Sequence, residues 1–358
     1  YYHNKKNEAL NHINNIVKKS NNLDVSTTLY PNEIKYKPNI HIIVLESFLD
    51  PSLIVDGKFN NAPLAEELEK YLGQKKDFSH VVSPVFGGST AQAEFEIITG
   101  VPALAKIESI EFNTMEGAPI NSFVRKLRNS GYFTSAMIGS NDTYFNSRIA
   151  YKSLGFEQVI FLRENTTILD NINRKLFGNN TDDKDLFDGD LFEANLEMFE
   201  EILQMNIEKK PILNYMLGFY GHYPFNRNIQ KRPDVIASSH SNKKVHKAAN
   251  QFYYRTKSLA LFIDKLLQID PNCIILVISD HLPALFNKST KYKKSIYENI
   301  AFFLKNGKFI DITGKKFYEI PWLIWDILSK SKPNGKRDFS DSELTDIYFN
   351  IIAEGMGM

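Results

Sequence analysis

The sequence has a single cysteine, and it contains no long apolar run. Cys273 has no second cysteine to pair with, so an internal disulfide is excluded. It opens the apolar run 273–278, which predicts a buried small hydrophobic residue and not a nucleophile. No stretch approaches the roughly 18 apolar residues that a membrane-spanning helix needs. The cysteine content fits a cytosolic protein and equally an extracytoplasmic domain.

The chain also lacks an excess of either charge. It has 43 lysine and arginine residues against 42 acidic residues, a net charge of +1. This balance predicts no nucleic-acid or other polyanionic partner. The 358 residues are 43% hydrophobic, which is enough for a large globular core. The chain opens on Tyr1 without a signal-peptide pattern, so we expect a piece of a longer protein in which residues 1–35 form a connecting or juxtamembrane segment.

Short apolar runs alternate with helical patterns along the chain. The runs predict strands buried on both faces: Ile40–Leu45, Phe133–Ile138, Ile212–Leu217, Ile274–Ile278 and Ile300–Leu304. The helical spacings are clearest at Ala62–Leu72, Ile120–Asn129, Leu191–Met205 and Ala248–Ile269. This alternation predicts an α/β fold with a mostly parallel central sheet and helices on both of its faces.

The polar stretches indicate how the chain is organised. Residues 36–305 are expected to form the catalytic domain, and residues 306–358 a small C-terminal subdomain of the same unit. Arg163–Asp190 is interpreted as a surface excursion, and the basic segment Asn226–Lys247 as a loop that could cover the site. After the turn-rich stretch Lys330–Asp341, Ser340 and Glu343 have the spacing of a capping box for a final helix.

A threonine stands where a helix is expected to begin. Ser89 with Gln92 has the form of a capping box, and Gly100 provides a stop. Thr90 would then sit at the positive end of the helix, where free N–H groups favour phosphate. An ordinary cap that happens to be followed by a threonine is the alternative.

Polar residues follow three of the predicted strands. Glu46 comes directly after Ile40–Leu45, Asp280 and His281 follow the strand at 274–278, and His222 lies shortly after 212–217. Ligands bind at the carboxyl ends of strands in open α/β sheets, so these residues should share one rim. Singly, each could be a solvated turn residue, a cap or a loop histidine. Together with Thr90 they form an oxygen-rich set that suits one divalent ion such as Mn²⁺, Mg²⁺ or Zn²⁺.

Five segments, in order between about residues 39 and 305, carry a family resemblance. The chain resembles the extracytoplasmic catalytic domain of lipoteichoic acid synthases and related phosphoglycerol and phosphoethanolamine transferases, in the sulfatase/alkaline phosphatase superfamily. The matching segments are Val-Leu-Glu-Ser-Phe at 44–48, Gly-Ser-Thr-Ala-Gln-Ala-Glu-Phe at 88–95, Tyr-Phe-Asn-Ser-Arg…Tyr-Lys-Ser-Leu-Gly at 144–155, Gly-His-Tyr-Pro-Phe at 221–225 and Ser-Asp-His at 279–281.

The resemblance implies roles for particular residues. Thr90 would be the nucleophile, and Glu46, Thr90, Asp280 and His281 would bind the metal, with Mn²⁺ the expected ion. His222 would contact the head group or phosphate, as would the segment with Phe145, Asn146 and Arg148. That segment departs from the family pattern, because Phe145 replaces a tryptophan and Ser147 an arginine, with Arg148 one place later. The reaction type is therefore better supported than the substrate.

The resemblance also implies a reaction, partners and a location. The donor would be a phospholipid such as phosphatidylglycerol or phosphatidylethanolamine, and the acceptor a glycan or polymer hydroxyl. The domain would lie outside the cytoplasm at a membrane surface, on a membrane-anchored protein. A mono-metal phosphodiesterase and a non-catalytic glycan- or lipid-binding domain remain alternatives. A sulfatase is disfavoured because neither Cys273 nor Thr90 stands in a Cys/Ser-x-Pro-x-Arg pattern, and a second metal because no histidine has an aspartate four residues before it.

Overall fold

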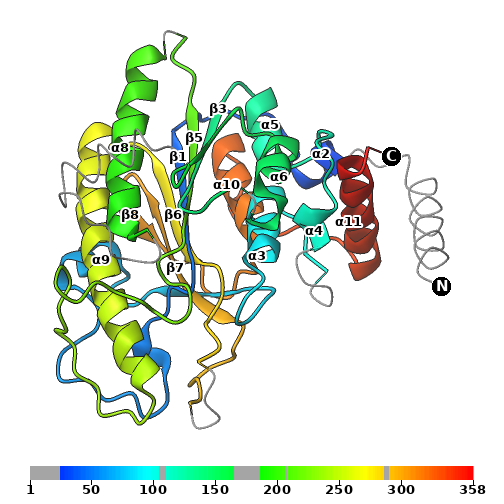
Figure 1. The fold of residues 1–358 in the computed structure, drawn as a ribbon. Helices are drawn as coiled ribbons and strands as arrows, with labels where there is room; N and C mark the ends of the chain where they lie inside the picture. The colour runs from blue at the N-terminus through cyan, green and yellow to red at the C-terminus, as the bar shows by residue number, and fades with distance from the viewer. Residues whose placement is uncertain are drawn as a thin grey trace.

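An eight-stranded mixed sheet forms the centre of the molecule (Figure 1). The computed structural model describes residues 25–104, 110–142, 144–164, 186–206, 208–285 and 290–357. The strand order is β2-β7-β6-β1-β5-β3-β4, and β8 pairs with β7. Strands β6, β1, β5, β3 and β4 run parallel, whereas β7 is antiparallel to β6, β2 and β8. The predicted α/β fold with a mostly parallel sheet is confirmed.

All five predicted strands are present, and three short strands were not predicted. The predicted ones are β1 (Ile40–Leu45), β3 (Phe133–Ile138), β5 (Ile212–Gly218), β6 (Ile274–Ser279) and β7 (Glu298–Lys305). The others are β2 (Ser79–Val82), β4 (Gln158–Phe161) and β8 (Lys308–Ile310). These three are only partly buried, so their sequences lack the continuous apolar run on which the prediction depended.

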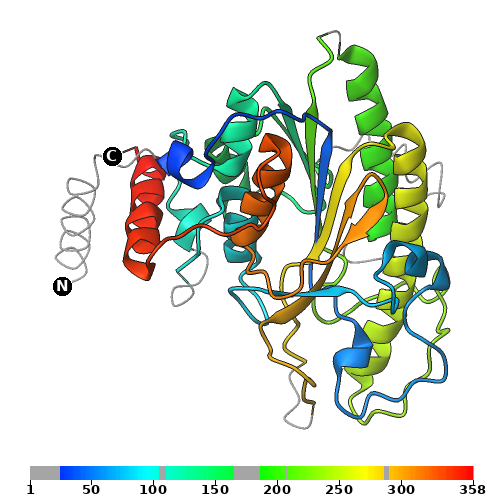
Figure 2. The same ribbon diagram turned by 180° about the vertical axis from the view of Figure 1, so that it is seen from behind.

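Alternate side chains along the strands pack into two separate hydrophobic cores, one on each face of the sheet. On β1, Ile42 and Val44 join the core under α3, α5, α6 and α10, whereas Ile43 and Leu45 join the core under α8 and α9. Figures 1 and 2 show the same division, with α8 and α9 on one side of the sheet and the other helices on the opposite side. Because both faces are covered, polar groups that bind a ligand are expected at the ends of β1, β5 and β6.

Most predicted helices lie close to their expected positions. The helices are α2 (Val25–Leu29), α3 (Thr90–Thr99), α4 (Ile110–Asn113), α5 (Phe123–Asn129), α6 (Ser147–Leu154), α8 (Asp188–Met205), α9 (Lys243–Ile269), α10 (Glu319–Ser329) and α11 (Asp341–Gly355), with 3₁₀ turns η1 (Pro51–Leu53), η2 (Glu66–Tyr71) and η3 (Tyr144–Asn146). The α-helix expected at Ala62–Leu72 is wrong. Ala65 is extended and its N–H donates to Thr256 Oγ1 of α9, so only η2 forms.

Two other expectations about the connecting segments need correction. The loop expected over 226–247 ends at Asn242, because the Asn242 side chain caps α9 by accepting from the Lys244 N–H. The excursion at 163–190 ends in helix, since α8 begins at Asp188, and residues 165–185 lie outside the described part. Residues 1–24 of the proposed connecting segment are also outside it. The Ser340–Glu343 capping box of α11 is confirmed.

Residues after 305 continue the same core. Ile320, Ile324 and Leu328 of α10 belong to the hydrophobic cluster that also contains Phe95 and Ile98 of α3. Helix α3, which carries Thr90, is thereby buried along its whole length. Within the described ranges, no helix combines the length and apolar character needed to cross a membrane.

Candidate metal and nucleophile site

The strand register brings the predicted polar residues to one place. Leu45, the last residue of β1, is paired with Gly218 of β5 on one side and with Ser279 of β6 on the other. Glu46 and Asp280 therefore leave neighbouring parallel strands at the same level of the sheet. The segment that contains His222 leaves β5 at that level too. The shared rim expected from the sequence is present.

Thr90 is the first residue of α3, as expected, but the helix start differs from the predicted capping box. Ser89 adopts a left-handed conformation (φ 67°, ψ 41°) and its side chain makes no capping hydrogen bond. The Gln92 amide instead donates to the Leu104 carbonyl oxygen at 3.0 Å. The predicted Ser89–Gln92 capping box is wrong, and the Ser89 side chain leaves the N–H groups at the start of α3, beside Thr90, without a side-chain cap.

Three predicted residues, Glu46, Asp280 and His281, gather beside the Thr90 hydroxyl. Thr90 Oγ1 lies 2.9 Å from Glu46 Oε2 and 2.9 Å from Asp280 Oδ2. His281 Nε2 lies 3.4 Å from Glu46 Oε1 and 3.3 Å from Asp280 Oδ2. One possible ligand atom each from Glu46, Asp280 and His281 falls within 4.8 Å of the others, and all three residues are buried.

Hydrogen bonds around the cluster orient its carboxylates. Asp280 Oδ1 accepts from the backbone N–H of Ser47 at 2.7 Å and of His281 at 2.6 Å, which leaves Oδ2 for Thr90. Ser47 Oγ donates to Glu46 Oε1 at 2.8 Å. The Ser83 hydroxyl donates to the Asp280 carbonyl oxygen at 2.7 Å. These supporting contacts direct Asp280 Oδ2 toward Thr90 and hold the Glu46 carboxylate and the Asp280 backbone in place.

The donor set fits a divalent metal ion. His281 Nδ1 lies 3.3 Å from the Leu282 carbonyl oxygen, an acceptor, so the ring proton belongs on Nδ1 and the lone pair on Nε2. That Nε2 atom is buried and has no hydrogen-bond partner among the described residues. A ring nitrogen with a free lone pair next to two carboxylates and a hydroxyl matches the ligand preferences of Mn²⁺, Mg²⁺ or Zn²⁺.

The buried carboxylates of Glu46 and Asp280 repel each other when no cation is bound. Burial and the negative charge of Glu46 raise the pKa of Asp280 to about 7. Burial also acts to raise the pKa of Glu46, but His281 and the hydrogen bond from Ser47 outweigh it and lower that pKa. Burial acts to lower the pKa of His281, and the two carboxylates outweigh it and raise the pKa. A bound dication would neutralise this pair of carboxylates.

His222 lies within electrostatic reach of the cluster. Its charge lowers the pKa of Glu46, and its Nδ1 atom lies 2.9 Å from the Tyr223 carbonyl oxygen. The side chain is half-buried. This placement agrees with a residue that contacts substrate, although the role itself stays a prediction.

The remaining predicted residues lie on η3 and the start of α6. Phe145 and Asn146 both have left-handed backbones, with φ values of 52° and 56°. The Asn146 amide donates to the carbonyl oxygens of Phe112 and Met115, at 3.0 Å each. Arg148 pairs with Asp142 and Glu164, at 2.5 Å each. None of the described contacts joins these three side chains to Thr90, so their substrate-binding roles also stay predictions.

Sequence reasoning missed a buried ion pair behind Glu46. Arg255 of α9 and Asp188 of α8 are 2% and 0% exposed, and Arg255 Nε lies 2.6 Å from Asp188 Oδ2. Arg255 Nη2 donates to the Glu46 carbonyl oxygen at 2.9 Å. A signal was available, because Arg255 interrupts the apolar stripe of α9 between Phe252 and Leu259.

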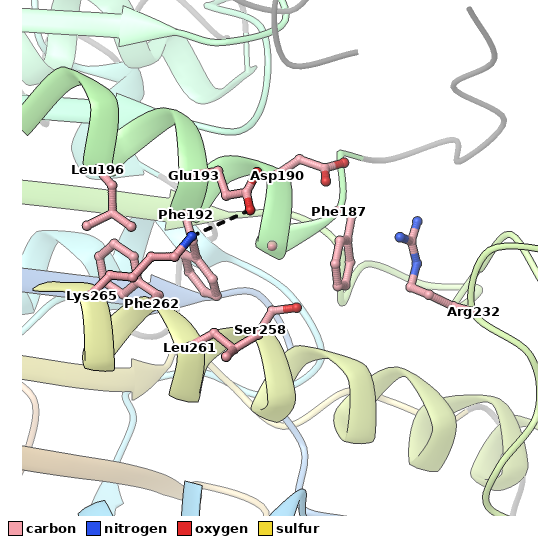
Figure 3. Close-up of a pocket in the computed structure, with 11 residues that line it drawn as sticks. Phe187, Asp190, Phe192, Glu193, Leu196, Arg232, Ser258, Leu261, Phe262 and Lys265 are labelled. Atoms are coloured by element: carbon pink, nitrogen blue, oxygen red, sulfur yellow. Dashed lines mark ion pairs between the residues drawn. The ribbon is translucent and has the colours of Figure 1, made fainter. Parts of the chain in front are cut away.

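A separate pocket lies between α8 and α9 (Figure 3). It is lined by residues of both helices and by Arg232, and Glu193 pairs with Lys265 across it at 4.0 Å. It contains none of the predicted site residues. The possible ligand cluster of Glu46, Asp280 and His281 is therefore separate from this pocket.

Comparisons with known proteins agree with the geometry. The family model described as Sulfatase matches residues 38–347. A putative cyclic beta-1,2-glucan modification protein of Rhizobium meliloti is 25% identical over 268 residues, which are 73% of this chain and 38% of that protein. The chain thus spans well under half of that relative.

Similar folds occur among solved structures. The Streptococcus pyogenes phosphoglycerol transferase GacH has a TM-score of 0.63 at 16% identity, covering 95% of this chain and 92% of that one. The Listeria monocytogenes lipoteichoic acid synthase LtaP has a TM-score of 0.61 at 18% identity, covering 87% and 78%. The C-terminal periplasmic domain of EptC from Escherichia coli has a TM-score of 0.54 at 15% identity, covering 85% of each chain. At these identities the likeness establishes a shared fold.

Proposed function

This chain belongs to the sulfatase family, and from that membership we propose that it is a metal-dependent transferase that moves a phospholipid head group through a phospho-threonine intermediate. The family name does not imply sulfate chemistry here, because Thr90 lacks the Cys/Ser-x-Pro-x-Arg context. The nucleophile would be Thr90 and the metal ligands Glu46, Thr90, Asp280 and His281.

One observation carries the proposal. The Thr90 hydroxyl lies 2.9 Å from both Glu46 Oε2 and Asp280 Oδ2, at a helix N-terminus without a side-chain cap. A threonine with a purely structural role would hydrogen-bond one acceptor and would not be placed between two buried carboxylates. Backbone N–H groups at the start of α3 are suited to hold a phosphoryl oxygen while the hydroxyl attacks phosphorus.

The chain's residues divide the chemistry between them. A divalent cation held by the four ligands would lower the pKa of the Thr90 hydroxyl and polarise a phosphoryl oxygen. Thr90 Oγ1 then forms a bond to phosphorus while the bond from phosphorus to the diacylglycerol oxygen breaks. The Thr90 proton passes to an adjacent carboxylate, Glu46 or Asp280, and His222 supplies a proton to the leaving diacylglycerol oxygen.

The second step restores Thr90. An acceptor hydroxyl attacks phosphorus, and its proton passes to His222. The bond from phosphorus to Thr90 Oγ1 breaks, and the proton held by Glu46 or Asp280 returns to Thr90 Oγ1. Phe145, Asn146 and Arg148 are proposed to line the head-group region. The acceptor is proposed to be a glycan, in line with the name of the Rhizobium relative, and the donor to be phosphatidylglycerol or phosphatidylethanolamine. We also propose that the domain acts outside the cytoplasm on a membrane-anchored protein.

Mass spectrometry of the Mn²⁺-loaded domain, after incubation with phosphatidylglycerol or phosphatidylethanolamine, tests the proposal. We expect a phosphoglycerol or phosphoethanolamine adduct on Thr90, smaller amounts of it in Thr90→Ser and none in Thr90→Ala. Labelling of Thr90→Ala at the wild-type level would overturn the assignment. Turnover of the lipid in water without any acceptor would instead identify a mono-metal hydrolase.

The absence of both labelling and turnover, with the lipid or glycan still bound, would identify a non-catalytic binding module. The buried site argues against that outcome. The three possible ligands are at most 3% exposed: Glu46, Asp280 and His281. Burial of ionisable groups costs free energy, which binding a cation would offset.

A further inference from the structure

The turn directly after β1 contacts the cluster on one side and α9 on the other. On one face, the Glu46 carboxylate contacts Thr90, and the Ser47 N–H donates to Asp280 Oδ1 at 2.7 Å. On the other face, the carbonyl oxygens of Glu46 and Ser47 are directed toward α9. The left-handed backbone of Ser47, with a φ of 46°, makes this division possible. Whatever holds the carbonyl face therefore sets the position of a metal ligand.

Arg255 occupies that carbonyl face. Its Nη2 donates to the Glu46 carbonyl oxygen at 2.9 Å, and its Nη1 lies 3.5 Å from the Ser47 carbonyl oxygen. The guanidinium carbon lies 5.0 Å from the centre of the Phe48 ring. One planar group thus touches three consecutive residues of the turn. A lysine has a single donor centre and cannot make these contacts together.

Asp188 holds the guanidinium in that orientation. Its Oδ2 atom lies 2.6 Å from Arg255 Nε, so the carboxylate binds one edge of the fork and leaves Nη1 and Nη2 for the turn. Asp188 is the first residue of α8, where a negative charge is favoured by the helix dipole. Figure 3 shows α8 and α9 side by side, with Phe187 at the start of α8 near Ser258 of α9.

Two glycines leave room for this ion pair. A Cβ atom at Gly221 would lie 1.9 Å from the Glu46 carbonyl oxygen and 2.4 Å from Arg255 Nη1. A Cβ atom at Gly218 would lie 2.5 Å from Asp188 Oδ1. Gly218 is the last residue of β5, and Gly221 belongs to the segment that leads from β5 to His222. The guanidinium is therefore packed between the turn that carries Glu46 and the segment that carries His222.

We propose that Arg255, oriented by Asp188, is the positioning residue that fixes Glu46 for metal binding and sets its place relative to His222. Its catalytic consequence rests on the proposed function, whereas its effect on the turn does not. Arg255 touches neither Thr90 nor the ligand atoms of the cluster in the described contacts. It acts through the backbone of Glu46 and Ser47.

The chain offers a matched control for the test. Arg337 is also a buried arginine, 10% exposed, paired with Asp326 at 2.9 Å, and its Nε donates to the Leu29 carbonyl oxygen at 3.0 Å. It lies in the C-terminal part of the chain, and its described hydrogen bonds are to Leu29, Asp326 and Lys336, not to residues of the cluster. Arg255→Lys and Arg337→Lys therefore remove equivalent guanidinium contacts in two places, and any general loss of stability should affect both.

The first measurement is hydrogen–deuterium exchange of the metal-free full chain. In Arg255→Lys we expect faster exchange in peptides that cover residues 44–50, whereas Arg337→Lys leaves these peptides at the wild-type rate. Wild-type exchange of this segment in folded Arg255→Lys overturns the proposal. Should Arg255→Lys fail to fold by circular dichroism, Asp188→Asn provides the same comparison with Arg255 retained.

The second measurement is Mn²⁺ binding by calorimetry. We expect Arg255→Lys to weaken Mn²⁺ binding roughly 10- to 100-fold, as is usual when a residue that orients a ligand is changed, and Arg337→Lys to bind as the wild type does. If Arg255→Lys binds Mn²⁺ as tightly as the wild type does, Arg255 does not position Glu46 for metal binding. That result leaves the proposed function intact. Failure of the wild type to bind Mn²⁺, Mg²⁺ or Zn²⁺ contradicts the proposed function, and the exchange data then still decide whether Arg255 fixes the turn.

Discussion

Glu46 and Asp280 approach the same oxygen atom, Thr90 Oγ1, at 2.9 Å each. A hydroxyl group has one proton, so it can donate to only one of these carboxylates at a time. The second carboxylate then faces an oxygen lone pair in a buried place, which is unfavourable unless a proton or a cation lies between them. The pKa of Asp280, raised to about 7, means that this carboxylate can bind a proton that relieves the repulsion. A bound metal ion would relieve it as well.

Metal binding should therefore stabilise the fold measurably. At a Mn²⁺ concentration of 100 times the Kd, we expect the free energy of unfolding to rise by about 2.7 kcal/mol. Asp280→Asn should lose this gain, because the amide oxygen is a weaker ligand and carries no charge. Thermal unfolding with Mn²⁺ and with a chelator measures the difference.

Glu193→Gln on α8 is a suitable control for that experiment. Glu193 is partly exposed and pairs only loosely with Lys265, at 4.0 Å. We expect this variant to respond to Mn²⁺ as the wild type does. A full Mn²⁺ response in Asp280→Asn would show that the ion binds elsewhere.

Glu96 on α3 should contribute to a loss of stability of the metal-free protein as the pH rises. Burial raises the pKa of Glu96 to about 8 from an ordinary value of 4.5. Between these two values the folded chain keeps a proton that the unfolded chain releases, so each step up in pH favours unfolding. At pH 7 the accumulated loss from this group is on the order of 3 kcal/mol.

Glu96→Gln removes this titration and keeps the shape of the side chain. Glu96 Oε1 accepts from the Ala103 N–H at 2.9 Å, and an amide oxygen can replace it. We expect the variant to match the wild type near pH 4.5 and to be more stable near pH 8.5, as measured by thermal unfolding in the presence of a chelator. Parallel pH profiles for the two proteins would contradict the assignment.

Local sequence patterns predicted the sheet and the gathering of Glu46, Asp280 and His281 at one rim, but not the contacts that support these residues. Apolar runs located β1, β5 and β6, and the residues that follow them were correctly expected at one rim. The start of α3 was placed at Thr90, yet Ser89 is left-handed and follows two glycines that also have positive φ values, so it does not cap the helix as its residue type predicts.

Long-range pairing explains the other omissions. β2 and β4 are short and partly exposed, and they become strands through pairing with β7 and β3 and not through their own sequence. Asp188 and Arg255 are 67 residues apart, so no local pattern predicts their contact. The lone signal was a charged residue on the apolar stripe of α9.

His222 should affect catalysis without affecting metal affinity. Its half-buried ring influences the charge of Glu46, but it is not among the ligand atoms within 4.8 Å of one another. We expect His222→Gln to slow head-group transfer roughly 100- to 10,000-fold, the range for loss of a proton-transfer group, with an unchanged Kd for Mn²⁺. Transfer kinetics and calorimetry separate the two effects.

His246→Gln is the control for that comparison. His246 lies on α9, is 33% exposed, and pairs with Asp234 at 3.2 Å. We expect it to transfer head groups at close to the wild-type rate. If His222→Gln also retained the wild-type rate, the proton-transfer role would pass to another residue.

Gly221 should tolerate no side chain, because of what lies beside it. Its backbone conformation is ordinary, so the constraint comes from the approach of the Glu46 carbonyl oxygen and Arg255, at 1.9 Å and 2.4 Å from an added Cβ. Relief requires the Glu46 turn or the His222 segment to move. We expect Gly221→Ala to lower the free energy of unfolding by about 1–3 kcal/mol, the usual cost of overpacking.

The same substitution should weaken Mn²⁺ binding at least tenfold, since the Glu46 turn carries a ligand. Gly139→Ala, after β3, is the comparison, because its added Cβ would meet the Leu217 carbonyl oxygen at 3.2 Å, a contact that a small shift relieves. Calorimetry and thermal unfolding of both variants test this. Gly221→Ala with wild-type Mn²⁺ affinity would mean that the His222 segment moves and the Glu46 turn does not, and head-group transfer should then be the property that falls.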